Sequence, residues 1–194
     1  MKSTLRCFIA LEIPTYVRAQ IDKAVRKAAR LFPSIRWTRS DQFHLTLKFL
    51  GGVPVAETPA LLTAVEEVCR RFGSFDLDFQ GLGAFPNPEQ PHTLWVGINR
   101  GTEEATSLAG AIDEKLKELG YPKEHRRFTP HLTIGRVRRG ESGSEELRAF
   151  LSENAERDFG VCEADAVTIY SSELSRRGPK YEPLAEISLG RYNF

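Results

Sequence analysis

Residues 43–51 have the sequence FHLTLKFLG, and residues 131–136 have the sequence HLTIGR. In both stretches apolar and polar residues alternate with a period of two, which is typical of a β-strand that buries one face. In the first stretch the alternation places His44, Thr46 and Lys48 on one face. We therefore predict two strands that each present an imidazole and a hydroxyl side by side, a surface suited to an anion.

The two stretches are related by an offset of 87 residues, which takes His44 to His131 and Thr46 to Thr133. The same offset matches further pairs along the chain: Leu45 with Leu132, Glu66 with Glu153, Phe72 with Phe159, Gly73 with Gly160 and Asp78 with Asp165. Coincidence is the alternative, because some offset always matches best, but matched residues in a matched order favour a duplication. We expect two similar α+β lobes related by a pseudo-two-fold axis, each with one His-x-Thr strand.

Segments with the periodicity of strands and of helices follow one another along the whole chain. The predicted strands cover residues 5–13, 35–37, 43–50, 75–79, 93–98, 131–137, 166–170 and 184–189. The predicted helices cover residues 14–31, 57–72 and 103–119, and the pattern Ser142-x-x-Glu145 predicts a capping box for a fourth helix. No long linker separates these elements, so we expect a single domain over residues 1–194.

The composition excludes several classes of protein. Hydrophobic residues make up 41% of the chain and charged residues 27%, which is the balance of a globular protein rather than a disordered one. The three cysteines lie in apolar or helical patterns without a C-x-x-C spacing, which predicts free thiols in a reducing compartment. No apolar run approaches the roughly 18 residues of a membrane span. We therefore expect a cytoplasmic protein with neither a membrane nor an obligate protein partner.

The net charge is only +1, from 27 basic and 26 acidic side chains, but the basic residues are clustered. Six of them, against one acid, lie within residues 123–139 around His131, and a second cluster lies within residues 176–180. Such clusters are usually solvated faces, although beside a phosphate site they favour phosphate binding. Arg136 is the candidate ligand. In a regular strand it would point away from His131, unless Gly135 allows a bulge that re-aims it.

Each histidine alone is more often a structural residue than a catalyst, so the functional interpretation depends on the pair. Two imidazoles on opposite sides of one phosphorus suit an in-line displacement, in which a base activates the nucleophile and an acid protonates the leaving oxygen. The threonine hydroxyls could donate to the non-bridging oxygens. A metal site is the other use of paired histidines, but histidine with threonine is a poor ligand set for zinc. We therefore expect neither a metal nor another cofactor.

Aromatic side chains near the two motifs could stack on a nucleobase. Trp37 and Tyr181 are the candidates, whereas Phe43 and Phe128, which are also nearby, are expected to pack in the core. The remaining histidines, His92 at a strand entrance and His125 in a charged loop, are expected at the surface.

Four segments, in this order along the chain, resemble the two-histidine (2H) phosphoesterase superfamily, and within it the RNA 2′,3′-cyclic phosphodiesterases, also called 2′-5′ RNA ligases. They are Leu5-Arg-Cys-Phe-Ile-Ala-Leu-Glu-Ile-Pro14, the stretch 43–51, Arg127-Phe-Thr-Pro-His-Leu-Thr-Ile-Gly-Arg136, and Ser171-Ser-Glu-Leu with Gly178-Pro-Lys-Tyr181. The resemblance covers essentially the whole chain. It implies a bilobal α+β fold, in which two pseudo-symmetric lobes of antiparallel sheet with outer helices surround a central cleft.

The resemblance also implies an enzyme that hydrolyses a 2′,3′-cyclic phosphate, at an RNA end or in a cyclic nucleotide, to a 2′-phosphomonoester without a metal. It implies that His44 donates a proton to the departing 3′ oxygen and that His131 is the base that activates water. Thr46, Thr133 and Arg136 would hold the phosphate. Two alternatives keep this site, a small cyclic phosphate as substrate or a 2′-5′ RNA junction formed in reverse. A non-catalytic module that binds RNA ends is the alternative of another class.

Overall fold

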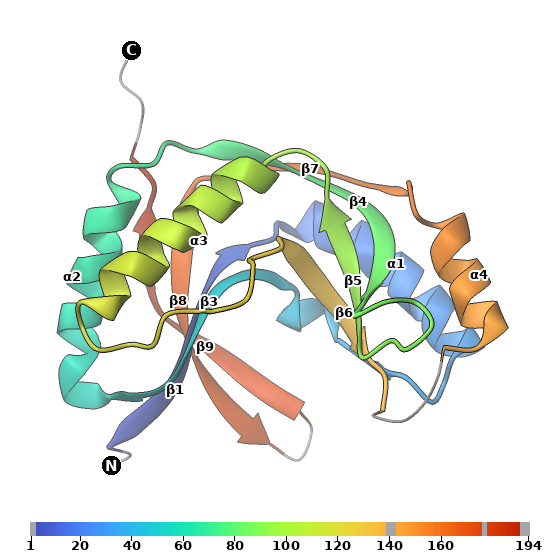
Figure 1. Cartoon of the computed structure of the whole chain (residues 1–194), viewed down its shortest axis with the longest axis horizontal. Helices are drawn as coiled ribbons and strands as arrows, with labels where there is room; N and C mark the ends of the chain where they lie inside the picture. The colour runs from blue at the N-terminus through green and yellow to red at the C-terminus, as the bar shows by residue number, and fades with distance from the viewer. Residues whose placement is uncertain (1–2, 139–142, 176–177, 191–194) are drawn as a thin grey trace.

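One nine-stranded antiparallel sheet organises the fold in the computed structural model, which describes residues 3–138, 143–175 and 178–190 (Figure 1). The strands are β1 (Thr4–Glu12), β2 (Arg36–Trp37), β3 (His44–Pro54), β4 (Phe75–Phe85), β5 (Thr93–Ile98), β6 (His131–Arg136), β7 (Asp158–Ala164), β8 (Ala166–Ser175) and β9 (Gly178–Ser188). The helices are α1 (Thr15–Leu31), α2 (Thr58–Cys69), α3 (Thr102–Lys117) and α4 (Glu145–Glu153). Neighbouring strands follow the order β7-β4-β5-β6-β3-β1-β8-β9, with β2 on β6. The predicted α+β class is confirmed.

The sheet is strongly curled, and the helices lie outside it in two pairs at opposite ends of the molecule (Figure 1). The helices α2 and α3 pack against each other at one end. At the other end Phe32, which follows α1, meets Phe150 of α4 edge to face with 5.6 Å between the ring centroids. This arrangement agrees with the two lobes and outer helices that the resemblance implied.

The expected two-fold relation lies between β3 and β6. These strands pair at Leu45 and Leu132, two residues that the 87-residue offset relates. Outward from this pair the order is β1 then β8 on one side, and β5 then β4 on the other. The offset takes β1 to β5 and most of β4 to β8. The strand β4, from the first half of the chain, therefore pairs beside β5 of the second half, and β8, from the second half, pairs beside β1 of the first. This exchange connects the two halves in one sheet.

The core sits between the sheet and the helices. In β1, which confirms the strand predicted over residues 5–13, the residues from Cys7 to Leu11 are all buried. In α1 the buried side chains recur at helical spacing: Val17, Ile21, Ala24, Val25 and Ala28. The three cysteines are free and buried, in agreement with their apolar surroundings in the sequence. No helix in the described ranges is long and apolar enough to cross a membrane.

Several details of the second half differ from the sequence-based expectation. The strands β8 and β9 are longer than the predicted segments 166–170 and 184–189. The fourth helix is confirmed, but its N-cap is Ser144, whose hydroxyl accepts a hydrogen bond from the backbone N–H of Leu147. Ser142, the predicted cap, lies outside the described residues. The strand β7 was not predicted, because a register shift opposite Phe79, at Phe159–Gly160, breaks the alternation of its buried residues.

Candidate active site

Both histidine motifs line one cleft of about 340 Å³. The motifs lie on β3 and β6, which are neighbours in the sheet. The strand β3 contributes His44 and Thr46, and β6 contributes His131, Thr133 and Arg136. Residues of β1, β2, β8 and β9 also line the cleft, among them Arg6, Phe8, Arg36, Trp37, Leu174 and Tyr181. The fold thus brings together all five residues that the sequence singled out for the site, and both aromatic candidates for base stacking.

The two imidazoles are held in the same way. Nδ1 of His44 lies 2.8 Å from the backbone carbonyl oxygen of Gln42, and Nδ1 of His131 lies 2.7 Å from that of Thr129. A carbonyl oxygen only accepts hydrogen bonds, so Nδ1 carries the proton in both rings. In the neutral ring Nε2 is then left as the acceptor, and it becomes a donor when the ring is charged. Each histidine is therefore oriented to exchange a proton through Nε2.

Aromatic rings surround the two histidines. The Phe8 ring lies over His44 with 4.7 Å between the centroids, and the Tyr181 ring meets His44 edge to face at 5.3 Å. Phe8 is in turn stacked on Tyr170. His131 meets Phe85 edge to face at 5.0 Å. These contacts fix the imidazole planes and exclude water from one side of each ring.

Burial lowers the pKa of both histidines, because desolvation disfavours the charged imidazolium. It brings the pKa of His44 from 6.5 to about 4, although the hydrogen bond to Gln42 acts in the opposite direction. Burial also lowers the pKa of His131, where the hydrogen bond to Thr129 opposes it and the positive charge of Arg136 adds to it. In the ligand-free cleft both imidazoles are thus neutral at pH 7.

A β-bulge follows each His-x-Thr motif at the same position. In β3 the partners of Ile9 and Ala10 are Lys48 and Thr46, so Leu47 is an extra residue. In β6 the partners of Leu94 and Trp95 are Gly135 and Thr133, so Ile134 is the extra one. Leu47 and Ile134 are themselves 87 residues apart. Both bulges shift the alternation of side chains by one residue, so that the strand beyond the threonine presents its other set of side chains to the cleft.

The bulge in β6 settles the orientation of Arg136. Its exposed side chain lines the same cleft as His131 and Thr133, as the sequence allowed if a bulge formed near Gly135. The equivalent residue in β3 is Phe49, which also lines the cleft. The two halves therefore place a guanidinium and a phenyl ring at corresponding positions.

The bulge in β3 overturns the prediction that Lys48 shares a face with His44. Lys48 is buried, 6% exposed, and its ammonium pairs with Asp113 of α3 and donates to the carbonyl of Pro122. Asp113 also accepts a hydrogen bond from the backbone N–H of Glu124. The extra residue at Leu47 reverses the alternation of side chains, so Lys48 points to the opposite face from the one that strict alternation predicts. Lys48 therefore anchors the segment that leads to His131 and does not line the cleft.

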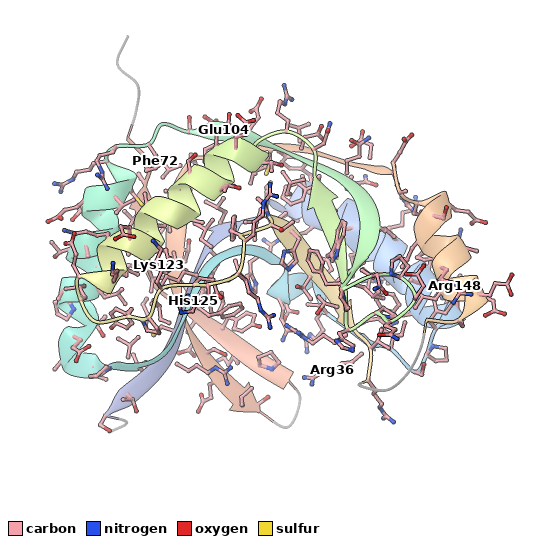
Figure 2. The ribbon with its side chains drawn as sticks, viewed as in Figure 1. Arg36, Phe72, Glu104, Lys123, His125 and Arg148 are labelled. Carbon is pink, nitrogen blue, oxygen red and sulfur yellow. The ribbon has the colours of Figure 1, made fainter. Side chains whose placement is uncertain are left out.

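Among the described Lys and Arg residues of the two basic clusters, Arg136 is the one that lines the cleft. Lys123, on the segment between α3 and β6 (Figure 2), pairs with Glu114, and Lys180 pairs with Glu182. Arg139, Arg176 and Arg177 lie outside the described residues. The cleft arginines that the sequence did not single out are Arg6 and Arg36. Their strand pairing places them there, and the sequence signal for Arg6 is its position in the first of the four segments that resemble the family.

The remaining expectations concern residues away from the cleft. His92 and His125 are both exposed, as predicted, and Phe43 is 4% exposed in the core. Within the described part of the chain, no group of three or more His, Cys, Asp or Glu residues is arranged to hold a metal ion.

A family model described as the 2′-5′ RNA ligase superfamily matches residues 14–176. The chain belongs to this superfamily. Among its relatives, an RNA 2′,3′-cyclic phosphodiesterase of Archaeoglobus fulgidus is 31% identical over 180 residues, covering 93% of this chain and 98% of the relative. An RNA 2′,3′-cyclic phosphodiesterase of Aeropyrum pernix is 33% identical over 173 residues, covering 84% of this chain and 95% of the relative.

Solved structures of similar fold agree with this membership. TT0787 of Thermus thermophilus has a TM-score of 0.81 at 28% identity, covering 97% of this chain and all of that one. LigT of E. coli, crystallised with 3′-AMP, has a TM-score of 0.76 at 24% identity, covering 96% and 98% of the two chains. The 2H phosphoesterase fold expected from the sequence motifs is therefore confirmed.

Proposed function

We propose that this member of the 2′-5′ RNA ligase superfamily hydrolyses the 2′,3′-cyclic phosphate at the end of an RNA to a 2′-phosphomonoester. The observation that carries the proposal is the pair of imidazoles, held alike through Nδ1, in one cleft with two threonine hydroxyls and a guanidinium. The relatives from Archaeoglobus and Aeropyrum carry the name of this activity. Because both halves contribute to the cleft, we also propose that residues 1–194 act as one bilobal domain.

The chemistry is a single displacement at phosphorus. Nε2 of His131 removes a proton from water while the water oxygen forms a bond to phosphorus. The bond from phosphorus to the 3′ oxygen breaks, and that oxygen receives a proton from Nε2 of His44. Each of these proton transfers is of the kind that contributes about 10²- to 10⁴-fold to a rate. The 2′ oxygen keeps its bond, so the product ends in a 2′-phosphate and a free 3′-hydroxyl.

The phosphate needs donors where negative charge builds up on its non-bridging oxygens. The hydroxyls of Thr46 and Thr133 follow the histidines by two residues and line the same cleft, so they supply one donor from each half. The guanidinium of Arg136 supplies a planar pair of donors and a full positive charge. These three groups hold the phosphate between the two imidazoles.

The low pKa of His44 requires that the acid acquires its proton together with the substrate. A cyclic phosphodiester carries one negative charge, and an anion beside an imidazole raises its pKa. The complex therefore binds a proton that the ligand-free cleft does not hold. In the complex either imidazole can hold that proton. Only the form with the proton on His44 and a neutral His131 can react, because His44 protonates the 3′ oxygen as it leaves.

Turnover of a short RNA that ends in a 2′,3′-cyclic phosphate tests the proposal. We expect a product with a 2′-phosphate, formed at the same rate with and without EDTA, because no step uses a metal. Adding an RNA with a free 5′-hydroxyl tests whether the same site also joins ends in a 2′-5′ linkage. A 3′-phosphate as product, or loss of turnover in EDTA, would contradict the mechanism. Binding without any product would favour the RNA-end-binding module instead.

A further inference from the structure

The cleft holds more positive charge than a single cyclic phosphate requires. Arg6, Arg36 and Arg136 line it beside the two histidines, and no Asp or Glu is among its described lining residues. None of the three arginines forms an ion pair with a described residue. Several exposed arginines elsewhere do have an acidic partner: Arg26 with Asp22, Arg39 with Asp41, Arg70 with Glu66 and Arg100 with Asp76. The cleft arginines are thus left for an anionic ligand.

Two of these cations face each other across one strand pair. In the pairing of β2 with β6, Arg36 is directly opposite Arg136, and both side chains are exposed. Like charges in directly opposite positions destabilise an antiparallel pair. In the view of Figure 2, Arg36 lies between the β8–β9 hairpin and β6. The hairpin and β6 both contribute residues to the cleft. Negative charges bound beside both guanidinium groups would relieve their repulsion.

The short strand β2 is firmly attached, so Arg36 does not simply swing away. The neighbouring Trp37 donates from its indole Nε1 to the carbonyl of Phe32 at 3.1 Å. Its ring lies against Gly135, where an added Cβ would come within 3.1 Å of the indole. These contacts hold β2 on β6 and thereby hold Arg36 beside Arg136.

Arg6 adds a third cation from β1, on the first half of the chain. The charges of Arg136, Arg36 and Arg6 all act to lower the pKa of the Tyr181 hydroxyl, although burial has the larger effect and raises it. All three guanidinium groups are therefore within electrostatic reach of one point on the cleft wall. Two exposed apolar side chains line the same cleft, Phe49 at 67% and Leu174 at 71% exposure. Exposed apolar groups beside a basic groove suit the stacking of nucleobases along a single strand.

We propose that Arg36 and Arg6 bind the internucleotide phosphates that precede the cyclic end, so that the cleft is built for an oligonucleotide rather than a cyclic mononucleotide. This inference rests on the proposed function. A cyclic phosphate brings one negative charge, which Arg136 and the two threonines already meet. Each further nucleotide on the 5′ side brings one more phosphate. The guanidinium groups of Arg36 and Arg6 can each bind one of these phosphates.

The test compares a 2′,3′-cyclic mononucleotide with a trinucleotide that ends in a 2′,3′-cyclic phosphate. We expect Arg36→Gln and Arg6→Gln each to lower kcat/KM for the trinucleotide about tenfold, as loss of a charge-assisted phosphate contact should. For the mononucleotide we expect a loss below about threefold, from the weaker positive field of the cleft. Arg100→Gln removes the same charge from an exposed arginine outside the cleft and should change neither value. Each cleft variant should also reduce the salt dependence of trinucleotide binding.

The outcomes separate this inference from the proposed function. Equal losses on both substrates would place Arg36 on the reacting phosphate and overturn the inference, as would no loss on either. If the wild-type protein turned over neither substrate, the proposed function would fail. Binding of a fluorescent trinucleotide with a 2′-phosphate end would then still decide the inference. In that assay Arg36→Gln must weaken binding while Arg100→Gln does not.

Discussion

The β3 and β6 halves of the cleft share a backbone but differ in the side chains that follow it. Each has a histidine held through Nδ1 by the carbonyl two residues earlier, and each has a bulge one residue after the threonine. Beyond the bulge, β3 continues with Lys48 and Phe49, whereas β6 continues with Gly135 and Arg136. In the proposed function the repeated part positions the acid and the base. The part that differs places a guanidinium on the β6 side and a phenyl ring on the β3 side.

Removing either imidazole should have the largest effect on turnover, because the two histidines are held in the same way and act on the same displacement. We expect His44→Ala and His131→Ala each to lower kcat by about 10²- to 10⁴-fold. The double variant should lose much less than the product of the two losses, since the groups act on one displacement. His125→Ala, an exposed histidine, is the matched control. A large loss in only one of the two variants would break the symmetry of the site.

The position after the bulge tests whether the halves differ in stability as well as in chemistry. Lys48→Met should lower the free energy of unfolding by about 3–5 kcal/mol, because Asp113 would remain buried without its partner. Lys180→Met breaks an exposed pair with Glu182 and should lower the free energy of unfolding far less, because solvent screens that pair. Chemical denaturation of both variants measures the difference. A double change of Lys48 and Asp113 to apolar residues should recover much of the stability, and equal losses in the two single variants would contradict the buried role of Lys48.

The deeper burial of His44 should make the folded protein sensitive to acid. The pKa of His44 is about 4 in the folded state and near 6.5 in the unfolded state, so the unfolded chain binds the extra proton between these values. The free energy of unfolding should therefore fall as pH falls from 6.5 towards 4, by up to about 3 kcal/mol from this group. His44→Gln should flatten that dependence. An unchanged slope would show that His44 is not the group responsible.

The equivalent positions Phe49 and Arg136 should divide phosphate and base binding between them. Arg136→Gln should lower kcat/KM about tenfold on every cyclic phosphate, whatever its base, because the group meets the phosphate. Phe49→Ala should have a smaller effect that depends on the base, since stacking strength differs between bases. Steady-state kinetics with 2′,3′-cyclic adenosine and cytidine phosphates compares them. A base-dependent loss at Arg136 and a uniform loss at Phe49 would reverse the assignment.

Much of this site could be predicted from the sequence, because its information is local. The His-x-Thr strands, the 87-residue repeat and the helices with a clear apolar face all follow from periodicity. The halves could also be predicted to meet around a two-fold axis, and the pairing of Leu45 with Leu132 bears this out.

The errors arose where an extra residue interrupts a strand. The bulge at Leu47 directs Lys48 into the core. The register shift at Phe159 interrupts the alternation that would have predicted β7. The periodicity of a sequence does not reveal such an extra residue, because a bulge depends on hydrogen bonds to a strand that is distant in the sequence. The same limit applies to Arg36, whose place in the cleft depends on its pairing with Arg136.

The pH dependence of turnover tests the paired acid and base most directly. For the wild-type protein kcat/KM should follow a bell-shaped curve with both limbs below the ordinary histidine pKa of 6.5, because burial lowers both values in the free cleft. The alkaline limb of kcat should lie at higher pH, since the bound anion raises the pKa of the acid. His44→Ala should lose the alkaline limb and His131→Ala the acid limb. A kcat/KM that stays flat between about pH 4 and 8, or the loss of the same limb in both variants, would contradict acid–base catalysis by this pair.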